Sequence, residues 1–435
     1  MKRLLVAAGA VLLLLLVAAA AFFFMPAPLP RARASADQPI GAALIAKGRY
    51  LATAADCVVC HTAPGGTPYA GGRAFVLPFG TLYSPNITPD RATGIGGWSD
   101  AEFVRALRHG VGRHGEDLYP AFPYASYARM TDDDALAIRA YLATLPAVRA
   151  AAPANALTFP FNQRWLMRGW KLLFLPHGSL RPDPARPPAW NRGAYLVEAL
   201  GHCGECHTPR NTLYGLKRTA RFAGATTQGW TAWNITSDPK AGIGGWPVDA
   251  LAAYLGTGHA DGHGAASGPM AEVVEASTSH LTPADQRAIA LYLKALPAKA
   301  ARHGESAEAT PPPLAASSTY APGTGEKPTL GRHIFEGACA SCHGWNGAGL
   351  QGPAAALLGA QSVTDPKATN VVQVILHGQS LAVPGGHIFM PAFGQAYSDP
   401  EIAAVANYVI AHFGGRSPSV SPSDVAAARK ISGGE

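Results

Sequence analysis

Cysteine is scarce in this sequence, and it is missing everywhere outside one short pattern. The 435 residues include 6 cysteines, and all of them belong to three Cys-x-x-Cys-His runs that begin at Cys57, Cys203 and Cys339. A four-cysteine zinc site is disfavoured, because no cysteine is left to complete one. Redox-active dithiols are disfavoured as well, since such pairs do not need a histidine directly after each of them.

The pattern Cys-x-x-Cys-His is typical of covalent c-type haem attachment. Two cysteines three positions apart lie on one face of a helical turn, so both sulfurs can reach one edge of a porphyrin. The adjacent histidine is then held against the iron as an axial ligand. The sequence therefore predicts three covalently bound haem c groups, with Cys57, Cys60, Cys203, Cys206, Cys339 and Cys342 as attachment residues and His61, His207 and His343 as iron ligands.

Charged residues are also few, at 14% of the chain, and no run of five basic residues occurs. The formal net charge of +7 would by itself suggest nucleic acid or an anionic membrane as a partner. Three haems, however, bring about six propionate charges that offset this excess. We therefore expect no nucleic-acid partner.

The sequence contains no dinucleotide-binding fingerprint, and no motif supplies a catalytic base or nucleophile. This predicts an electron carrier whose partner performs the catalysis. Two alternatives remain open. One is a self-contained haem enzyme, such as a peroxidase or a sulfur-compound oxidase, that uses the first haem. The other is a stand-alone shuttle that feeds an oxidase directly.

Two of the three motif regions share further segments in the same order. Gly-x-Tyr-Leu stands before the motif, and Asn-Ile-Thr and Gly-Ile-Gly-Gly-Trp follow it, whereas the third region lacks the last two segments. Shared order and spacing of this kind indicate an internal duplication. The paired segments are 48–51 and 193–196, 86–88 and 234–236, and 94–98 and 242–246.

Glycine (48) and proline (37) are abundant, which predicts short helices joined by turn-rich segments. A chain of this length has room for about three domains, so one haem per domain is expected. Last helices are predicted over 132–144, 283–295 and 399–412, the first two capped by Thr131 and Thr282. The predicted boundaries are 1–36 for an anchor or signal, 37–152 for domain 1, 153–190 for a connector, 191–300 for domain 2, 301–327 for a Pro/Ala/Ser-rich linker, 328–415 for domain 3 and 416–435 for a flexible tail.

The N-terminus carries Lys2 and Arg3 followed by residues 4–25, which have no charge. As a helix this stretch is about 33 Å long, enough to cross a bilayer. The competing interpretation is a cleaved signal peptide, because Ala34-Ser35-Ala36 resembles a cleavage site. We favour a retained anchor, and both interpretations place the haem motifs outside the cytoplasm.

The connector contains a predicted helix over 161–175 with one basic stripe and a broad apolar face. Such a helix can lie on a membrane surface. It can equally pack two domains together, which is the interpretation we favour. The stripe consists of Arg164, Arg168 and Lys171.

The second axial ligand of each iron is expected to be a methionine, because three methionines fall one to each domain between the motif and the last helix. They are Met130, Met270 and Met390. Met130 departs from the pattern of the other two, since it stands directly before Thr131, and His109 and His114 are the alternatives in domain 1. In domain 3, the carbonyl of Pro353 is the candidate partner for the other ring nitrogen of His343.

Taken together, the three attachment motifs, the paired segments and Phe159-Pro160-Phe161-Asn162 resemble one known group over residues 40–415. This group is the triheme cytochrome c subunit of membrane-bound dehydrogenases for alcohols, gluconate, sorbitol or fructose, and of related molybdenum hydroxylases such as nicotinate dehydrogenase.

The resemblance implies an all-α fold of three class I cytochrome c-like domains in tandem behind an N-terminal membrane anchor. It implies a partner catalytic subunit of the flavin, quinoprotein or molybdenum type, and electron delivery to ubiquinone or a terminal oxidase of the respiratory chain. The location implied is the periplasmic face of the bacterial inner membrane. The family's methionine ligands match Met270 and Met390, but many relatives have Met-Pro-Tyr where this chain has Phe122-Pro123-Tyr124.

Overall fold

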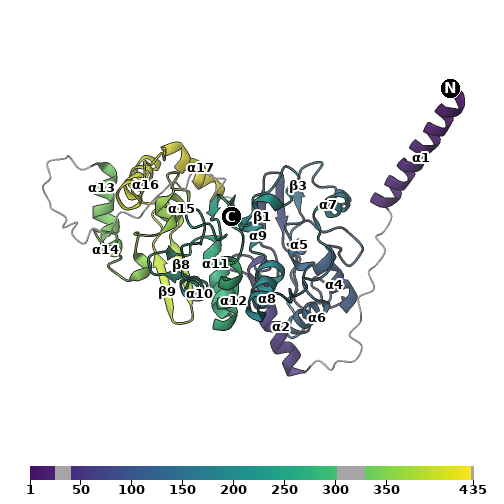
Figure 1. The fold of residues 1–435 in the computed structure, drawn as a ribbon, viewed down its shortest axis with the longest axis horizontal. Helices are drawn as coiled ribbons and strands as arrows, with labels where there is room; N and C mark the ends of the chain where they lie inside the picture. Colours follow the sequence, from purple (N-terminus) through teal and green to yellow (C-terminus); the bar gives the residue numbers. More distant parts are fainter. Residues whose placement is uncertain (25–40, 301–328, 433–435) are drawn as a thin grey trace. The chain divides into compact units, whose positions relative to one another are not determined.

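The computed structural model describes residues 1–24, 41–300 and 329–432, so the candidate cleavage site at 34–36 and the linker at 301–327 lie outside the described residues. The chain forms two compact units (Figure 1). Unit 1 comprises Met1–Arg181 with Glu198–His202, and unit 2 comprises Pro182–Val197 with Cys203–Glu435. Three regions each hold one attachment motif: region 1 (41–150), region 2 (182–299) and region 3 (329–415).

Unit 1 is mostly helical, and its sheet is small and antiparallel in the order β1-β2-β3. Its helices and strands are α1 (Lys2–Phe24), α2 (Ala42–Ala54), α3 (Cys57–Cys60), β1 (Ala74–Leu77), β2 (Gly80–Tyr83), α4 (Asp100–His109), α5 (Tyr124–Tyr127), α6 (Asp132–Leu142), β3 (Ala156–Leu157) and α7 (Leu166–Phe174).

Unit 2 is also mostly helical, with three two-stranded antiparallel hairpins. Its elements are α8 (Pro188–Tyr195), α9 (Gly204–His207), β4 (Ala225–Thr227), β5 (Trp230–Ala232), α10 (Val248–Thr257), β6 (His259–Ala260), β7 (Gly264–Ala265), α11 (Pro269–Ala276), α12 (Pro283–Lys294), α13 (Leu330–Ile334), α14 (Ala340–His343), α15 (Thr369–His377), β8 (Gln379–Val383), β9 (Gly386–Met390), α16 (Asp399–Gly414) and α17 (Pro422–Ser432). The short hairpins in both units were not predicted.

The last helix of each region begins at the residue that the sequence predicted. Thr131 caps α6 by accepting a hydrogen bond from the backbone N–H of Asp134 (3.2 Å), and Thr282 caps α12 in the same way. Ser398 opens α16 with a capping box. Satisfying the free N–H groups of the first turn stabilises each helix start by about 1 kcal/mol.

The first and last helices of every region cross at a glycine. The pairs are α2 with α6, α8 with α12 and α13 with α16. At each crossing a Cβ on the glycine would overlap a backbone carbonyl of the last helix, so only glycine permits this close packing. The glycine and carbonyl pairs are Gly48 with Ala137, Gly193 with Ala288 and Gly331 with Ala404.

Regions 1 and 2 also share a turn after their middle helix. Gly110 caps the end of α4 and Gly258 caps the end of α10, both in the left-handed conformation with φ of 59° and 72°. A short hairpin then returns the chain to the helix end. There the N–H of Leu118 donates to the Gly110 carbonyl (2.8 Å), and the N–H of Ala266 donates to the Gly258 carbonyl (2.7 Å).

Region 3 packs directly against region 2 within unit 2. The hairpin β8–β9 lies on α11, where the fully buried Leu381 joins a small core with Val274. The side chain of Asn370 accepts from the N–H of Thr231 (2.8 Å) and donates to its carbonyl (3.0 Å). The two regions therefore share a core, although a linker separates them in the sequence.

The prediction of a flexible tail is wrong for residues 422–432, which form α17. Val425 is fully buried against the region 3 core. Arg429 donates to the carboxylate of Asp399 (2.6 Å) and to the carbonyl of Tyr397 (2.8 Å), which ties the helix to the start of α16. Burial of the Val425 side chain stabilises this helix, although the polar composition of the segment had suggested a flexible tail.

The connector helix α7 is shorter than predicted and has its basic stripe turned inward. Arg168 and Lys171 form ion pairs with the buried carboxylate of Asp117 (3.2 and 2.7 Å) in unit 1. Leu172 and Leu173 are 67% and 57% exposed. The helix thus anchors on region 1 through charges and presents leucines on its open face.

Candidate haem-attachment sites

Each Cys-x-x-Cys-His run forms a short helical turn directly after the first helix of its region. The turns are α3, α9 and α14. Each contains two of the three motif residues, and the third is the cap residue next to the turn: His61 follows α3, Cys203 precedes α9 and Cys339 precedes α14. Asp56 and His202, which precede the first two motifs, adopt positive φ of 53° and 39°. A π-helical turn, Phe335–Cys339, leads into the third motif.

The first cysteine of each motif lacks the lowered pKa of an activated thiol. Burial raises the pKa of Cys57 and Cys203 to about 12 and that of Cys339 to about 11. Redox-active and metal-binding cysteines instead have lowered pKa values. In the part of the chain that the structure describes, no group of three or more His, Cys, Asp or Glu side chains converges to hold a metal ion.

The three motif histidines have the same orientation relative to the backbone. In each one, Nδ1 lies within hydrogen-bond distance of a carbonyl oxygen, which can only accept, so Nδ1 carries the proton. The Nε2 lone pair is then available for an iron, as required of an axial haem ligand. The distances are 2.8 Å from His61 to Pro85, 2.6 Å from His207 to Trp233 and 2.6 Å from His343 to Ala355.

The prediction that Pro353 orients His343 is wrong, because the carbonyl of Ala355 accepts the hydrogen bond. Pro353 begins the short 3-10 turn that carries Ala355. The partners of His61 and His207 were not predicted, although Pro85 and Trp233 stand directly before the repeated Asn-Ile-Thr segments. This shared position in the repeat was the sequence signal that could have identified both carbonyl partners.

The asparagines of the two Asn-Ile-Thr segments connect distant parts of the chain in regions 1 and 2. The Asn86 amide donates to the carbonyl of Val148 (2.7 Å) and its oxygen accepts from the N–H of Thr88 (2.8 Å). Asn234 makes the corresponding bonds, donating to the carbonyl of Lys299 (2.7 Å). Each asparagine therefore joins the segment behind the histidine to the chain that follows the last helix.

The methionines proposed as second ligands lie in different settings. Met270 is the second residue of α11 and is half-buried beside the Leu381 cluster. Met390 ends β9 and is half-buried against the region 3 core. Met130 is fully buried in region 1, while His109 is half-buried and His114 is exposed. The axial roles of these residues remain predictions.

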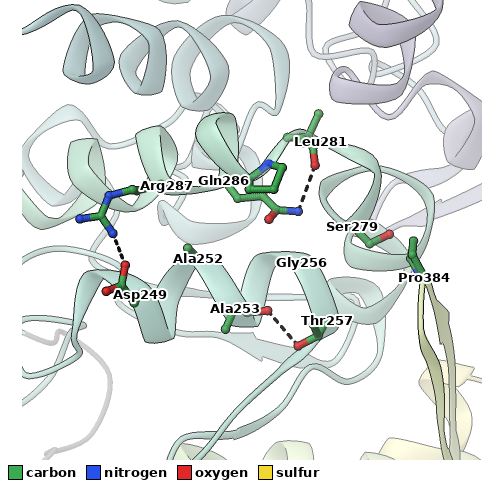
Figure 2. Close-up of a pocket in the computed structure, with 11 residues that line it drawn as sticks. Asp249, Ala252, Ala253, Gly256, Thr257, Ser279, Leu281, Gln286, Arg287 and Pro384 are labelled. Carbon is green, nitrogen blue, oxygen red and sulfur yellow. Dashed lines mark hydrogen bonds and ion pairs between the residues drawn. The ribbon is translucent and has the colours of Figure 1, made fainter.

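A surface hollow of about 510 Å³ lies between α10 and α12 (Figure 2). No histidine, cysteine or methionine lines it. Its polar side chains already have partners: Gln286 donates to the carbonyls of Thr278 and Leu281, and Arg287 pairs with Asp249. The hollow is therefore not a candidate haem site.

Comparison with known proteins identifies the class of this chain. The cytochrome c family model matches residues 45–146, and that of cbb3-type cytochrome c oxidase subunit III matches residues 326–409. The chain is 40% identical to the fructose dehydrogenase cytochrome subunit of Gluconobacter japonicus, over 88% of its own length and 82% of that protein. It is 39% identical to the gluconate 2-dehydrogenase cytochrome c subunit of Pantoea cypripedii, over 91% and 92%. The chain belongs to the family of dehydrogenase cytochrome c subunits.

Another relative of this cytochrome c subunit is much longer. It is a nicotinate dehydrogenase subunit of Pseudomonas putida, which is 42% identical over 87% of this chain. The chain spans only 31% of that protein's length.

The prediction of an electron-transfer subunit, rather than a catalytic one, is confirmed by these relatives. The alternative of a self-contained haem enzyme is not favoured. The family also agrees with the chemistry of the sites, since two free cysteines beside a histidine with a free Nε2 fit covalent haem c.

Proposed function

We propose that this cytochrome c subunit carries three haem c groups, one in each of three class I cytochrome c-like domains at 37–152, 191–300 and 328–415. It takes electrons from a dehydrogenase catalytic subunit and delivers them to ubiquinone or a terminal oxidase. The observation that carries this proposal is the threefold recurrence of a Cys-x-x-Cys-His turn whose histidine donates through Nδ1 to a backbone carbonyl. When bound, each haem supplies a one-electron redox couple.

The three regions also share a packing scheme that supports one haem in each region. Every region brings its first and last helices together at a glycine, with the attachment turn between them. A domain of about 100 residues buries little core by itself, and a haem fills much of the space that these short helices leave.

Met270 and Met390 are proposed as second ligands of the second and third irons. Each lies after its motif and before the last helix, on the segment that follows a short hairpin or ends one. Neither is part of a tightly closed core, since both remain half-buried. A thioether ligand raises the reduction potential of a haem, which suits transfer toward a quinone or an oxidase.

The catalytic partner is proposed to be a periplasmic dehydrogenase of the flavin, quinoprotein or molybdenum type. The named relatives are subunits of fructose, gluconate, alcohol and nicotinate dehydrogenases. In this arrangement a separate catalytic subunit binds the substrate, and the cytochrome subunit receives only electrons.

The test uses the full chain purified from membranes. We expect three haems per chain, measured by alkaline pyridine absorbance against protein mass. We also expect co-purification with a dehydrogenase subunit encoded beside it, and reduction of the haems when the substrate of that enzyme is added. Fewer than three haems, or a protein that always purifies alone and is never reduced in this way, contradicts the proposal.

The location proposed is the periplasmic face of the bacterial inner membrane, with α1 retained as an anchor. Among the described residues, α1 is the one helix long and apolar enough to cross a membrane, and its surface is open to solvent. Arg168 of α7 donates to the Phe22 carbonyl at the end of α1 (2.6 Å), and the Trp165 ring packs on Phe23. We propose that α7 lies on the membrane surface beside this anchor.

The exposed leucines of α7 provide a test of this location. Replacing Leu172 and Leu173 with serine, in a protein lacking residues 1–36, is expected to weaken binding to phospholipid vesicles by at least about tenfold, because a fully buried leucine contributes about 1.5–3 kcal/mol. Vesicle co-sedimentation measures this. Leu213 of unit 2 is equally exposed at 57%, so Leu213→Ser is the matched control. Equal losses in the two proteins would argue against α7 as the contact.

A further inference from the structure

We propose that the first haem has no methionine ligand and that its second axial position takes a small exogenous ligand such as carbon monoxide or cyanide. Phe122 occupies the position that Met270 has in region 2, and Met130 is a core residue. This inference rests on the proposed haem attachment at Cys57, Cys60 and His61.

The shared turn after the middle helix fixes the correspondence between the two regions. In each region the chain returns from the hairpin and donates one N–H to the carbonyl of the left-handed glycine that ends the helix. Leu118 does this to Gly110, and Ala266 does it to Gly258. Leu118 and Ala266 are therefore equivalent positions, because the same hydrogen bond closes the same turn.

Counting on from these positions places Phe122 opposite Met270. Phe122 is four residues after Leu118, and Met270 is four residues after Ala266. Both side chains are half-buried, and a short helix begins beside each of them, α5 or α11. The phenyl ring has no lone pair to give to an iron, whereas the thioether has one.

Contacts in region 1 place Phe122 close to the first attachment motif. Its ring lies 5.6 Å from the ring of Tyr127, measured between centroids. The Tyr127 hydroxyl in turn donates to the carbonyl of Ala55 (2.8 Å). Ala55 stands two residues before Cys57, so this aromatic pair is held against the start of the motif.

Met130 corresponds instead to a core leucine of region 2. It stands directly before Thr131, the cap of α6, as Leu281 stands directly before Thr282, the cap of α12. Met130 is 0% exposed and Leu281 is 6% exposed. The equivalent cap position is thus an apolar packing site in both regions, and methionine fills it as an ordinary core residue.

His109, one of the two alternative ligands, occupies the last position of α4. The equivalent residue of α10 is Thr257, since each directly precedes the left-handed glycine. The Thr257 hydroxyl bonds to the carbonyl of Ala253 (2.9 Å) within its own helix. This position belongs to the helix end and not to the segment that carries Met270.

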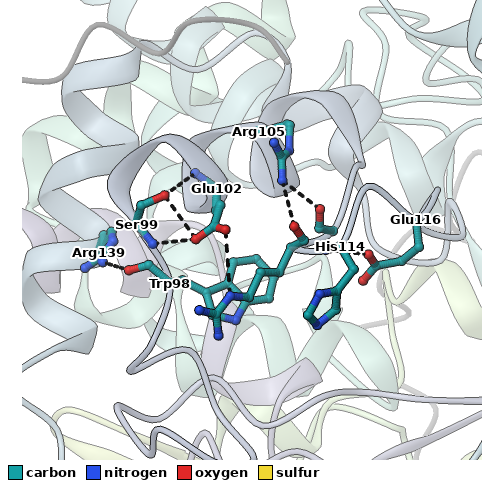
Figure 3. Close-up of polar contacts among 9 residues, drawn as sticks. Trp98, Ser99, Glu102, Arg105, His114, Glu116 and Arg139 are labelled. Carbon is teal, nitrogen blue, oxygen red and sulfur yellow. Dashed lines mark hydrogen bonds and ion pairs between the residues drawn. The ribbon is translucent and has the colours of Figure 1, made fainter. Parts of the chain in front are cut away.

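His114, the other alternative, lies in the hairpin loop and is exposed. Arg105 holds this loop by donating to two of its carbonyls, and the His114 N–H donates to Glu116 (2.9 Å), as Figure 3 shows. The histidine of the corresponding loop in region 2 is His263, whose ring stacks on Trp246 at 3.8 Å. His114 and His263 thus both lie before the segment that carries Phe122 in region 1 and Met270 in region 2.

Without a thioether, the first iron is expected to have the lowest reduction potential of the three. Phe122 and Tyr127, whose rings are in contact, would offer an aromatic surface near its second axial position. Small molecules that bind iron through one atom fit such a position, because they do not need a polar pocket of their own.

The experiment compares full-length wild type with Phe122→Met and Met130→Leu. In wild type we expect carbon monoxide to bind one of the three reduced haems, and near-infrared magnetic circular dichroism to show two methionine–iron sites per chain. Phe122→Met should abolish carbon monoxide binding and raise the methionine–iron count to three. Met130→Leu conserves core volume and should change neither reading.

Three methionine–iron sites in wild type, loss of one in Met130→Leu, or no carbon monoxide binding would each overturn the inference. Carbon monoxide binding that persists in Phe122→Met would overturn the assignment of Phe122. The wild-type and Met130→Leu readings decide the question independently of how well Phe122→Met folds. Failure of the proposed function differs from all of these, because it gives fewer than three haems per chain.

Discussion

Replacing Gly193 with leucine is expected to prevent region 2 from folding. A Cβ at this position would overlap the carbonyl of Ala288 and would lie 2.9 Å from the Cβ of Tyr292. The carbonyl belongs to the backbone of α12, so no side-chain rotation relieves the clash. Forcing α8 and α12 apart should cost about 3 kcal/mol or more, a large part of the 5–15 kcal/mol that stabilises a typical domain.

The measurement is the yield of soluble protein together with its haem content and its thermal midpoint. Gly386 is the matched control, since it lies in the same unit and a Cβ there would meet nothing within 4 Å. Gly386→Leu should therefore keep the wild-type midpoint. A Gly193→Leu protein with three haems and an unchanged midpoint would show that the helices do not cross as closely as the structure has them.

Replacing Cys203 and Cys206 together with serine is expected to remove one haem and to reduce electron delivery from the dehydrogenase to the background rate. Serine cannot form the thioether bonds, so His207 loses the cofactor that it would hold. Haem content and substrate-driven quinone reduction by the purified complex measure the effect.

Two comparisons make this result specific. The single variant Cys203→Ser keeps one attachment sulfur and should retain more of the haem than the double variant. Quinone reduction by a two-haem protein at the wild-type rate would mean that the second haem lies off the electron path.

The features predictable from the sequence were those carried by particular side chains. The Cys-x-x-Cys-His runs mark the attachment turns, and Thr131 and Thr282 mark helix starts because a threonine cap has a specific hydrogen-bonding role. The duplicated segments also predicted the matched architecture of regions 1 and 2. These signals are local, so they can be recognised without knowing the packing.

What could not be predicted depends on contacts between distant parts of the chain. The Ala355 carbonyl that orients His343 has no side-chain signature, since every residue carries a carbonyl. Val425 lies in a polar segment, and its burial follows only from the surface that α16 offers. The sequence of α7 does not show whether its basic face points to solvent or to the protein. That orientation depends on the ion pairs that Arg168 and Lys171 form with the buried Asp117.

The glycine crossings bear on how the protein is made. Synthesis begins at the N-terminus, so each attachment motif is made before the last helix of its region. Until that helix is made, the glycine face of the first helix has no last helix to pack against. The closing bonds of Asn86 and Asn234 come later still, since they reach residues beyond the last helix. We therefore expect haem attachment to precede helix closure in each region.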